Sequence, residues 1–211
     1  MGRANRVINR MKVLGWIDDE TYEKAVAESI AKIEAEVGPI DILINNAGNA
    51  HGLDPIQDGN IEDWDDMLDI NVKGLLYVSK AVIPQMTKRQ SGHIINIGSS
   101  AGREVYPKGN VYCASKHAVA AINDGMRIDL NPFGIKVSSI NPGLVETEFS
   151  KVRFKGGTVA DSVYKGYKAL QPEDIAEIIY FAITRPQHVN IADLLVFPTA
   201  QANSVTVKKE F

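Results

Sequence analysis

Apolar positions along the chain follow two different spacings in turn. Residues 18–37 carry apolar side chains three and four positions apart, as one face of an amphipathic helix requires. Residues 40–44 form a short apolar run that ends in the polar turn Asn45-Asn46-Ala47-Gly48. A run of this kind is typical of a buried parallel strand. The pattern therefore predicts a helix capped by Asp18 or Asp19, followed by a strand.

The same helix and strand spacings recur through the rest of the chain. The predicted helical segments are residues 61–89, 112–130 and 171–184, and the predicted strands are residues 93–97, 136–140 and 194–197. Strands that alternate with long helices form right-handed crossovers, which place the strands side by side in a parallel sheet. We therefore predict an α/β fold in which helices cover both faces of a doubly wound parallel sheet.

The composition indicates the size of the domain and argues against some classes of binding partner. The chain has 211 residues, of which 45% are hydrophobic, and this is enough apolar material for one globular domain. Its 23 lysine and arginine residues are scattered and the net charge is −3, whereas nucleic-acid or anionic membrane surfaces require a basic stripe. We therefore expect neither nucleic acid nor membrane as a partner.

Cysteine and histidine usage narrows the predicted setting and chemistry. Cys113 is the only cysteine, so the chain cannot form an internal disulfide, and the charged start of the sequence does not resemble a signal peptide. We therefore expect a cytoplasmic protein. The four histidines are spread along the chain without the spacing of metal ligands, and we predict no metal site.

Small and polar residues follow each of the first three predicted strands. They are residues 45–48, 98–102 and 141–143. Each is, by itself, typical of an ordinary strand-ending turn. In an open parallel sheet, however, ligands bind in the crevice beyond the carboxyl ends of the strands. We therefore expect these three turns to line one binding crevice.

Tyr112 and Lys116 bring reactive groups to that crevice. They lie four positions apart at the start of a predicted helix, so both side chains leave the same face. An ammonium group beside a phenol favours the phenolate form, which makes the tyrosine a better acid or base. Ser99, in the turn after the second predicted strand, could hold a substrate oxygen while Tyr112 exchanges its proton.

These motifs together resemble the short-chain dehydrogenase/reductase family. The family pattern combines an Asn-Asn-Ala-Gly turn, a serine thirteen positions before a Tyr-x-x-x-Lys pair, a Pro-Gly-x-x-x-Thr segment and a helical asparagine. In this chain the matching positions are residues 45–48, Ser99, Tyr112 with Lys116, Pro142-Gly143 with Thr147, and Asn71. The resemblance extends from about residue 18 to the C-terminus.

The resemblance implies a role for each catalytic position. Tyr112 would be the catalytic acid and base, and Ser99 would orient the carbonyl or alcohol oxygen of the substrate. Lys116 would lower the pKa of Tyr112 and bind the nicotinamide ribose. Asn71 would anchor a water molecule that continues the proton relay. The implied reaction is hydride transfer between a nicotinamide and an alcohol carbon.

The resemblance also implies a cofactor site. Asn45 and Gly48 would border the adenosine side of the dinucleotide, while Pro142, Gly143 and Thr147 would border its nicotinamide side. The branch that this chain resembles oxidises 3-hydroxy acids such as serine and 3-hydroxypropionate. That branch implies NADP as the cofactor, and the sequence leaves NAD open.

A basic segment after the third predicted strand occupies the place of the family's substrate lid. Residues 148–156 contain Lys151, Arg153 and Lys155. An arginine matches the planar geometry of a carboxylate, so Arg153 is our candidate for binding the acid group of a substrate. The alternative interpretation is a solvated basic loop.

One part of the family pattern has no counterpart in the sequence. The family begins with a strand and a Thr-Gly-x-x-x-Gly-x-Gly loop whose backbone amides hold the pyrophosphate. We find no such loop, and we interpret residues 1–17 as an atypical segment in place of the first βαβ units, with residues 18–211 as the remaining catalytic part of a truncated Rossmann-type domain. The strand at residues 40–44 would then form an exposed apolar edge.

Two functional hypotheses follow from these observations. The first is an NADP-dependent oxidoreductase acting on a small 3-hydroxy acid or related carbonyl compound, with assembly into a homo-oligomer through the long helices. The second is a catalytically inactive remnant that binds dinucleotide weakly or not at all and serves as an interaction module. Turnover of 3-hydroxy acids would separate them.

Overall fold

The computed structural model describes residues 18–210 as a parallel sheet covered by helices. Within that range the sheet has four strands in the order β1-β2-β3-β4. They are β1 (Ile42–Asn45), β2 (His93–Ile97), β3 (Lys136–Pro142) and β4 (Asp193–Val196). This arrangement confirms the predicted α/β class and each predicted strand to within two residues. The predicted segment of residues 1–17 lies outside the described residues.

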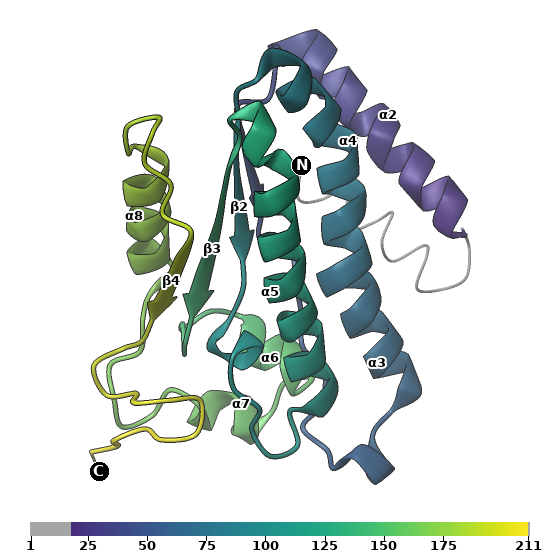
Figure 1. Ribbon diagram of the computed structural model, residues 1–211. Coiled ribbons are helices and arrows are strands. Elements are labelled where there is room, and N and C mark those ends of the chain that lie inside the picture. The colour runs from purple at the N-terminus through teal and green to yellow at the C-terminus, as the bar shows by residue number, and fades with distance from the viewer. Residues whose placement is uncertain (1–17, 211) are drawn as a thin grey trace.

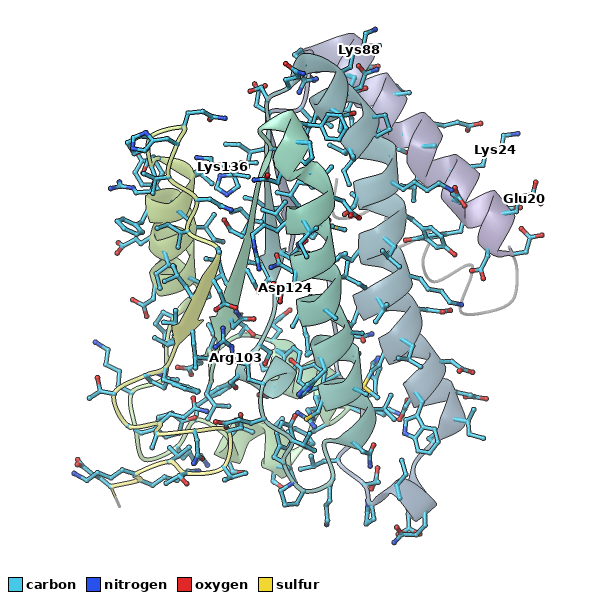
Figure 2. All side chains as sticks on the ribbon, viewed as in Figure 1. Glu20, Lys24, Lys88, Arg103, Asp124 and Lys136 are labelled. Carbon is cyan, nitrogen blue, oxygen red and sulfur yellow. The ribbon has the colours of Figure 1, made fainter. Side chains whose placement is uncertain are left out.

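Helices cover the two faces of the sheet (Figure 1). On one face lie α4 (Leu75–Arg89) and α5 (Asn110–Leu130), with α2 (Asp19–Val37) packed on α4. The other face is covered by α8 (Pro172–Ile183). The predicted sandwich of helices around a doubly wound sheet is therefore confirmed. Charged side chains such as Glu20 and Lys24 point from α2 away from the sheet (Figure 2).

The central strands β2 and β3 are buried along almost their whole length. Successive side chains of a strand point to opposite faces, and both faces of this sheet are covered. Ile94 and Val137 are paired neighbours that pack under α4, while Ile95 and Ile140 pack toward α8. All four are fully buried.

The first strand differs from the prediction that it is buried. Ile42 and Ile44 are 42% and 43% exposed, because β1 is an end strand of the sheet formed by residues 18–210. Leu43, on the other face, packs against the core beneath α4. Among the residues that the structure describes, β1 therefore agrees with the other expectation, that of an exposed apolar edge strand.

The segment predicted as one long helix, residues 61–89, consists of three parts. α3 (Ile61–Leu68) leads into a π-helical turn, η2 (Asp69–Gly74), and then into α4. Such widened turns are rare and often lie at functional sites. Asn71, a predicted site residue, lies in this turn.

The carboxyl ends of the strands face two short helices, α6 (Phe149–Arg153) and α7 (Thr158–Ser162), and the C-terminal segment (Figure 1). The basic segment predicted to be a lid therefore lies at the edge of the sheet where the crevice was expected. In the part of the chain that is described, no helix is both long and apolar enough to cross a membrane.

Candidate active site

A large cleft lies beyond the carboxyl ends of β2 and β3. Its volume is about 870 Å³, which is ample for a dinucleotide half and a small substrate. Eight of the ten predicted site residues line it: Gly48, Ser99, Tyr112, Lys116, Pro142, Gly143, Thr147 and Arg153. The other two, Asn45 and Asn71, lie behind its wall.

The start of α5 places Tyr112 and Lys116 one helical turn apart on the cleft wall. Each is 8% exposed. Ser99 caps the short helix η3 (Ser100–Gly102), where its hydroxyl accepts a hydrogen bond from the Ala101 amide at 3.1 Å. The hydroxyl of Ser99 also reaches the phenol of Tyr112 by a hydrogen bond. A substrate oxygen at this point would meet two hydroxyl groups.

Burial dominates the titration of both reactive groups. It raises the pKa of Tyr112 to about 12, against the opposing effects of the Ser99 hydrogen bond and the Arg153 charge. Burial also lowers the pKa of Lys116 to about 8. At neutral pH the structure therefore holds a protonated phenol beside a lysine that is largely protonated.

The role predicted for Lys116 as the group that lowers the Tyr112 pKa stays a prediction. In this structure the lowering effects on that pKa come from Ser99 and Arg153. The Lys116 ammonium instead donates a hydrogen bond to the carbonyl oxygen of Ile97 at 3.1 Å. This bond fixes the ammonium group at the end of β2.

Asn71 connects the π-helical turn to the wall of the cleft. Its amide nitrogen donates to the Asn49 carbonyl oxygen at 2.9 Å and to the Ser115 hydroxyl at 3.0 Å. Gly48 packs closely here, because a Cβ at that position would lie 3.1 Å from Asn71 Oδ1 and 3.5 Å from Lys116 Nζ. A glycine at residue 48 therefore lets Asn71 and Lys116 approach the same corner.

Asn45 is placed differently from its predicted role at the adenosine side. Its amide nitrogen donates to the Ser79 hydroxyl at 3.0 Å and to Asn96 Oδ1 at 2.9 Å. These bonds tie β1 to α4 and β2. The next residue, Asn46, is the one that lines the cleft. A direct contact of Asn45 with cofactor stays a prediction.

Pro142, Gly143 and Thr147 form the part of the cleft wall that follows β3. Gly143 has no room for a side chain, because a Cβ there would collide with Gln201 Oε1 and Phe197 Cδ1. Gln201 in turn accepts a hydrogen bond from the Leu144 amide at 2.8 Å. The C-terminal segment thus holds the backbone of this wall in place.

Arg153 ends α6 and crosses the cleft toward Tyr112. Its Nε donates to the Gly52 carbonyl oxygen at 3.1 Å, and its Nη1 donates to the Tyr106 hydroxyl at 2.7 Å. The guanidinium carbon lies 5.4 Å from the centroid of the Tyr112 ring. Phe149, at the start of α6, packs on the same ring with 5.8 Å between the centroids. The lid helix therefore covers the catalytic tyrosine candidate.

A family model decides the classification. Residues 3–156 match the family described as short chain dehydrogenase. The chain belongs to the short-chain dehydrogenase family. The resemblance inferred from the motifs is thereby confirmed.

Relatives of known name support the same branch as the sequence motifs. The chain is 47% identical to the NADP-dependent 3-hydroxy acid dehydrogenase YdfG of Escherichia coli O6:H1 over 87% of this chain and 75% of that protein. It is 46% identical to the NADP-dependent 3-hydroxy acid dehydrogenase of Schizosaccharomyces pombe over 86% of this chain and 70% of that protein. Among solved structures, a closed form of serine dehydrogenase complexed with NADP+ is 44% identical, with a TM-score of 0.84 over 89% of this chain and 77% of that one.

The described part of this short-chain dehydrogenase fits the nicotinamide half of a dinucleotide. The residues after the strands are small, and at Gly48 and Gly143 a side chain would fill the space beside Lys116 or the cleft wall. Lys116 supplies a buried donor at the same place. Among residues 18–210, no three metal-ligating side chains of histidine, cysteine, aspartate or glutamate come together.

Two residues of the short-chain dehydrogenase cleft were missed by sequence reasoning. Tyr106 holds Arg153, and it packs where Gly109 leaves space for its ring. Gln201 follows β4, so the rule that ligands bind beyond the carboxyl ends of strands could have indicated it. Tyr106 carried no spacing signal, because the lid that it contacts lies 47 positions further along the chain.

Proposed function

We propose that this chain catalyses hydride transfer between NADP(H) and a small 3-hydroxy acid, with the matching carbonyl acid as the oxidised partner. The observation that carries the proposal is that Ser99, Tyr112, Lys116 and Arg153 face one cleft. The names of the relatives and the family membership support the branch and the cofactor. The alternative of an inactive remnant has no comparable support.

In the proposed mechanism Tyr112 moves the proton. During reduction its phenol donates a proton to the carbonyl oxygen, and during alcohol oxidation its phenolate takes the hydroxyl proton. Ser99 donates a hydrogen bond to the same substrate oxygen and fixes its position. With a pKa of about 12, Tyr112 is protonated at neutral pH and suits the reducing direction.

Lys116 and Asn71 support that proton transfer. The Lys116 ammonium would bind the ribose next to the nicotinamide and favour the phenolate form of Tyr112 as it develops. Asn71 would hold a water molecule that passes the proton on from Lys116. The structure is consistent with a relay from Lys116 to Asn71, because both side chains come close to the backbone of Gly48.

The cofactor would lie along the ends of β2 and β3. A bound NADP would supply the hydride acceptor in oxidation, and its reduced form the hydride donor. Pro142, Gly143 and Thr147 would contact the nicotinamide side, and Gly48 the adenosine side. Asn45 would act there through the strand ends that it ties together.

Arg153 would bind the substrate carboxylate. Two of its nitrogens are already held by Gly52 and Tyr106, which fixes the plane of the guanidinium group. No described residue is hydrogen-bonded to its Nη2, so this nitrogen is available to a carboxylate oxygen. An acid bound there would lie beside the Tyr112 ring, with its hydroxyl carbon near the proton donor.

Turnover of the purified chain tests the proposal. We expect NADP reduction with L-serine or 3-hydroxypropionate, followed by absorbance of the reduced nicotinamide, and a lower rate with a neutral alcohol of similar size. Parallel calorimetry with NADP and NAD would compare the two cofactors. Absence of both turnover and dinucleotide binding would favour the inactive remnant.

Two further properties complete the proposal. We place the protein in the cytoplasm, supported by the lone cysteine. We also propose a homo-oligomer that assembles through the long helices. Sedimentation of the purified chain would measure its assembly state directly.

A further inference from the structure

The loop of residues 49–52 lies between the reaction centre and the lid, and apart from the bond of Gly52 to Arg153 the mechanism above gives it no role. The backbone amide and carbonyl groups of its first residue, Asn49, both form hydrogen bonds with the Asn71 side chain. The Asn49 amide donates to Asn71 Oδ1 at 2.8 Å, and the Asn49 carbonyl oxygen accepts from Asn71 Nδ2 at 2.9 Å. The orientation of the Asn71 side chain therefore depends on where this loop lies.

The last residue of the loop is bound to the lid in the same way. The Gly52 amide donates to the Arg153 carbonyl oxygen at 3.0 Å, and the Gly52 carbonyl oxygen accepts from Arg153 Nε at 3.1 Å. Four hydrogen bonds thus connect a loop of four residues to the relay residue at one end and to the carboxylate-binding candidate at the other. A displacement of the loop would move both.

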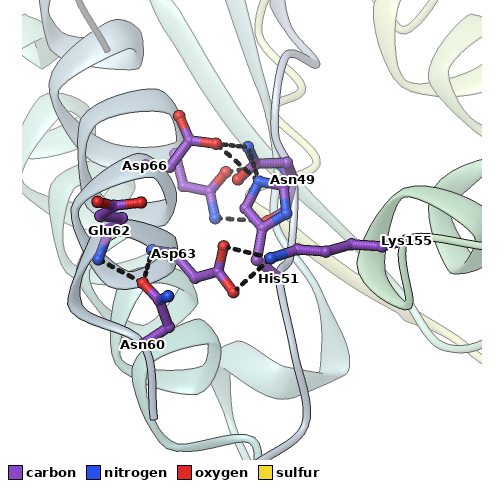
Figure 3. A network of polar contacts seen from close by, with 8 residues as sticks. Asn49, His51, Asn60, Glu62, Asp63, Asp66 and Lys155 are labelled. Carbon is purple, nitrogen blue, oxygen red and sulfur yellow. Dashed lines mark hydrogen bonds and ion pairs between the residues drawn. The ribbon is translucent and has the colours of Figure 1, made fainter. Parts of the chain in front are cut away.

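His51 fixes this loop to α3. Its Nε2 lies 2.7 Å from Asp66 Oδ2, and the side-chain nitrogen of Asn49, Nδ2, donates to the same oxygen at 3.2 Å (Figure 3). The side chains of His51 and Asp66 are 15% and 21% exposed, so the contact is largely shielded from water. Two donors from the loop therefore converge on one carboxylate oxygen of the helix.

The other ring nitrogen shows which tautomer makes this contact. His51 Nδ1 is buried and has no hydrogen-bond partner among the described residues. Burying an N–H group without an acceptor is costly, whereas Nε2 has a carboxylate oxygen within reach. We therefore assign the proton of a neutral His51 ring to Nε2, which donates it to Asp66. Asn49 Nδ2, which lies 2.9 Å from the same ring nitrogen, then donates to Asp66 and not to the ring.

α3 also holds the lid directly. Lys155 Nζ lies 3.1 Å from both carboxylate oxygens of Asp63, one turn before Asp66 (Figure 3). Both contacts start from the same helix, but only the His51 contact reaches the loop that binds Asn71. Together with the Asn49 side chain, His51 therefore ties to α3 the loop that joins the two halves of the site.

We propose that His51, held by Asp66, is a positioning residue of the dehydrogenase site. It fixes residues 49–52 so that Asn71 and Arg153 keep their places at the same time. The kinetic consequence rests on the proposed function, whereas the fixing of the loop does not. His51 does not line the large cleft in which substrate and cofactor would lie.

Amide hydrogen exchange tests the fixing of the loop without any need for activity. In His51→Leu, which removes the donor, we expect the Asn49 and Gly52 amides to exchange at least about tenfold faster, as for a lost charge-assisted hydrogen bond. The Gly98 amide, which donates to the Ile140 carbonyl oxygen within the sheet, should keep its rate. His51→Gln retains a donor for Asp66 and should restore protection at both amides.

Kinetics of the same variants test the positioning. We expect His51→Leu to lower kcat through Asn71 and to raise KM for the hydroxy acid through Arg153, with a combined loss in kcat/KM of about tenfold or more. His51→Gln should recover most of it, and His188→Gln, at an exposed histidine, should match the parent. Unchanged amide exchange in a folded His51→Leu, or faster exchange with parental kinetics, would overturn the proposal. A parent with no turnover would instead contradict the proposed function and leave the exchange result to decide on His51.

Discussion

The two sides of the cleft are built in different ways. The catalytic side consists of Ser99, Tyr112 and Lys116 on the ends of β2 and α5, and its tyrosine and lysine are each 8% exposed. The lid side consists of α6 and α7, where Val152 and Val159 are 47% and 55% exposed. Packing in the sheet core holds the first side, whereas polar contacts at the rim and the packing of Phe149 on Tyr112 hold the second.

This difference separates the reaction from substrate selection. Groups that transfer a proton must keep their geometry to a fraction of an ångström. The buried catalytic side, which we call the platform, provides that rigidity. A lid must admit substrate, and weakly packed elements open at lower free-energy cost than a core does. We therefore expect changes on the platform to affect kcat and changes on the lid to affect KM and selectivity.

The largest expected effect lies on the platform. Tyr112→Phe removes the proton donor while keeping the ring that packs on Phe149, so kcat should fall by about a thousandfold or more with little change in stability. Steady-state rates and a thermal melt measure both. Tyr106→Phe is the matched control, because it removes a hydroxyl from the same cleft and should mainly raise KM. A Tyr112→Phe variant with near-parental kcat would remove the basis of the assignment.

The second prediction concerns the lid. Arg153→Met should cost about ten- to a hundredfold in kcat/KM for serine or 3-hydroxypropionate, as for a lost charge-assisted pair, and much less for a neutral alcohol. Lys151→Met removes the same charge from an exposed position on the same helix and serves as the control. Equal losses on acidic and neutral substrates would show that Arg153 does not recognise the carboxylate.

The third prediction uses the pKa of Tyr112 to compare the two reaction directions. Oxidation needs the phenolate, so its kcat/KM should rise with pH, by up to about tenfold per pH unit below the Tyr112 pKa. Reduction needs the phenol and should not show that rise. Loss of the Lys116 proton above a pH of about 8 should reduce the slope of the oxidation profile. Parallel profiles in both directions would contradict a proton-transfer role for Tyr112.

The smallest expected effect concerns the exposed connection between the lid and α3. Lys155→Gln removes the contact with Asp63, in which the lysine side chain is 66% exposed. Surface pairs contribute about 1 kcal/mol or less, so KM should change by about two- to fivefold, and the difference should shrink at high salt. A change in kcat of similar size would show that the lid and the platform are less separate than their packing indicates.

The sequence predicted the fold well where a periodic pattern was buried on both faces. Residues 93–97 were predicted correctly at both ends, because every side chain of β2 faces a covered surface. The exposure of Ile42 and Ile44 could not be read from the same pattern, since an apolar run does not state which strands lie beside it. The π-helical turn around Asn71 was also missed, because its residues fit an α-helix equally well.

In the candidate site, too, some features could be predicted from the sequence and others could not. Spacing predicted that Ser99, Tyr112 and Lys116 line one cleft, because a strand end and a helix face determine their directions. The contacts of Arg153 with Gly52 and Tyr106 join segments 101 and 47 positions apart, and no local pattern encodes them. The use of Asn45 as a tie between strands was likewise decided by its distant partners Ser79 and Asn96.

The strand order also has a consequence for how the chain folds. Each strand from β1 to β4 pairs with the one that follows it in the sequence, so the sheet can grow by adding one helix and one strand at a time. Each pairing nevertheless joins residues about 43 to 54 positions apart, so every step closes a long loop and is expected to be slow. The cleft, however, needs Asn71 from an early unit and Gln201 from the last. A growing chain would therefore acquire its sheet gradually and its complete cleft only when the final segment docks.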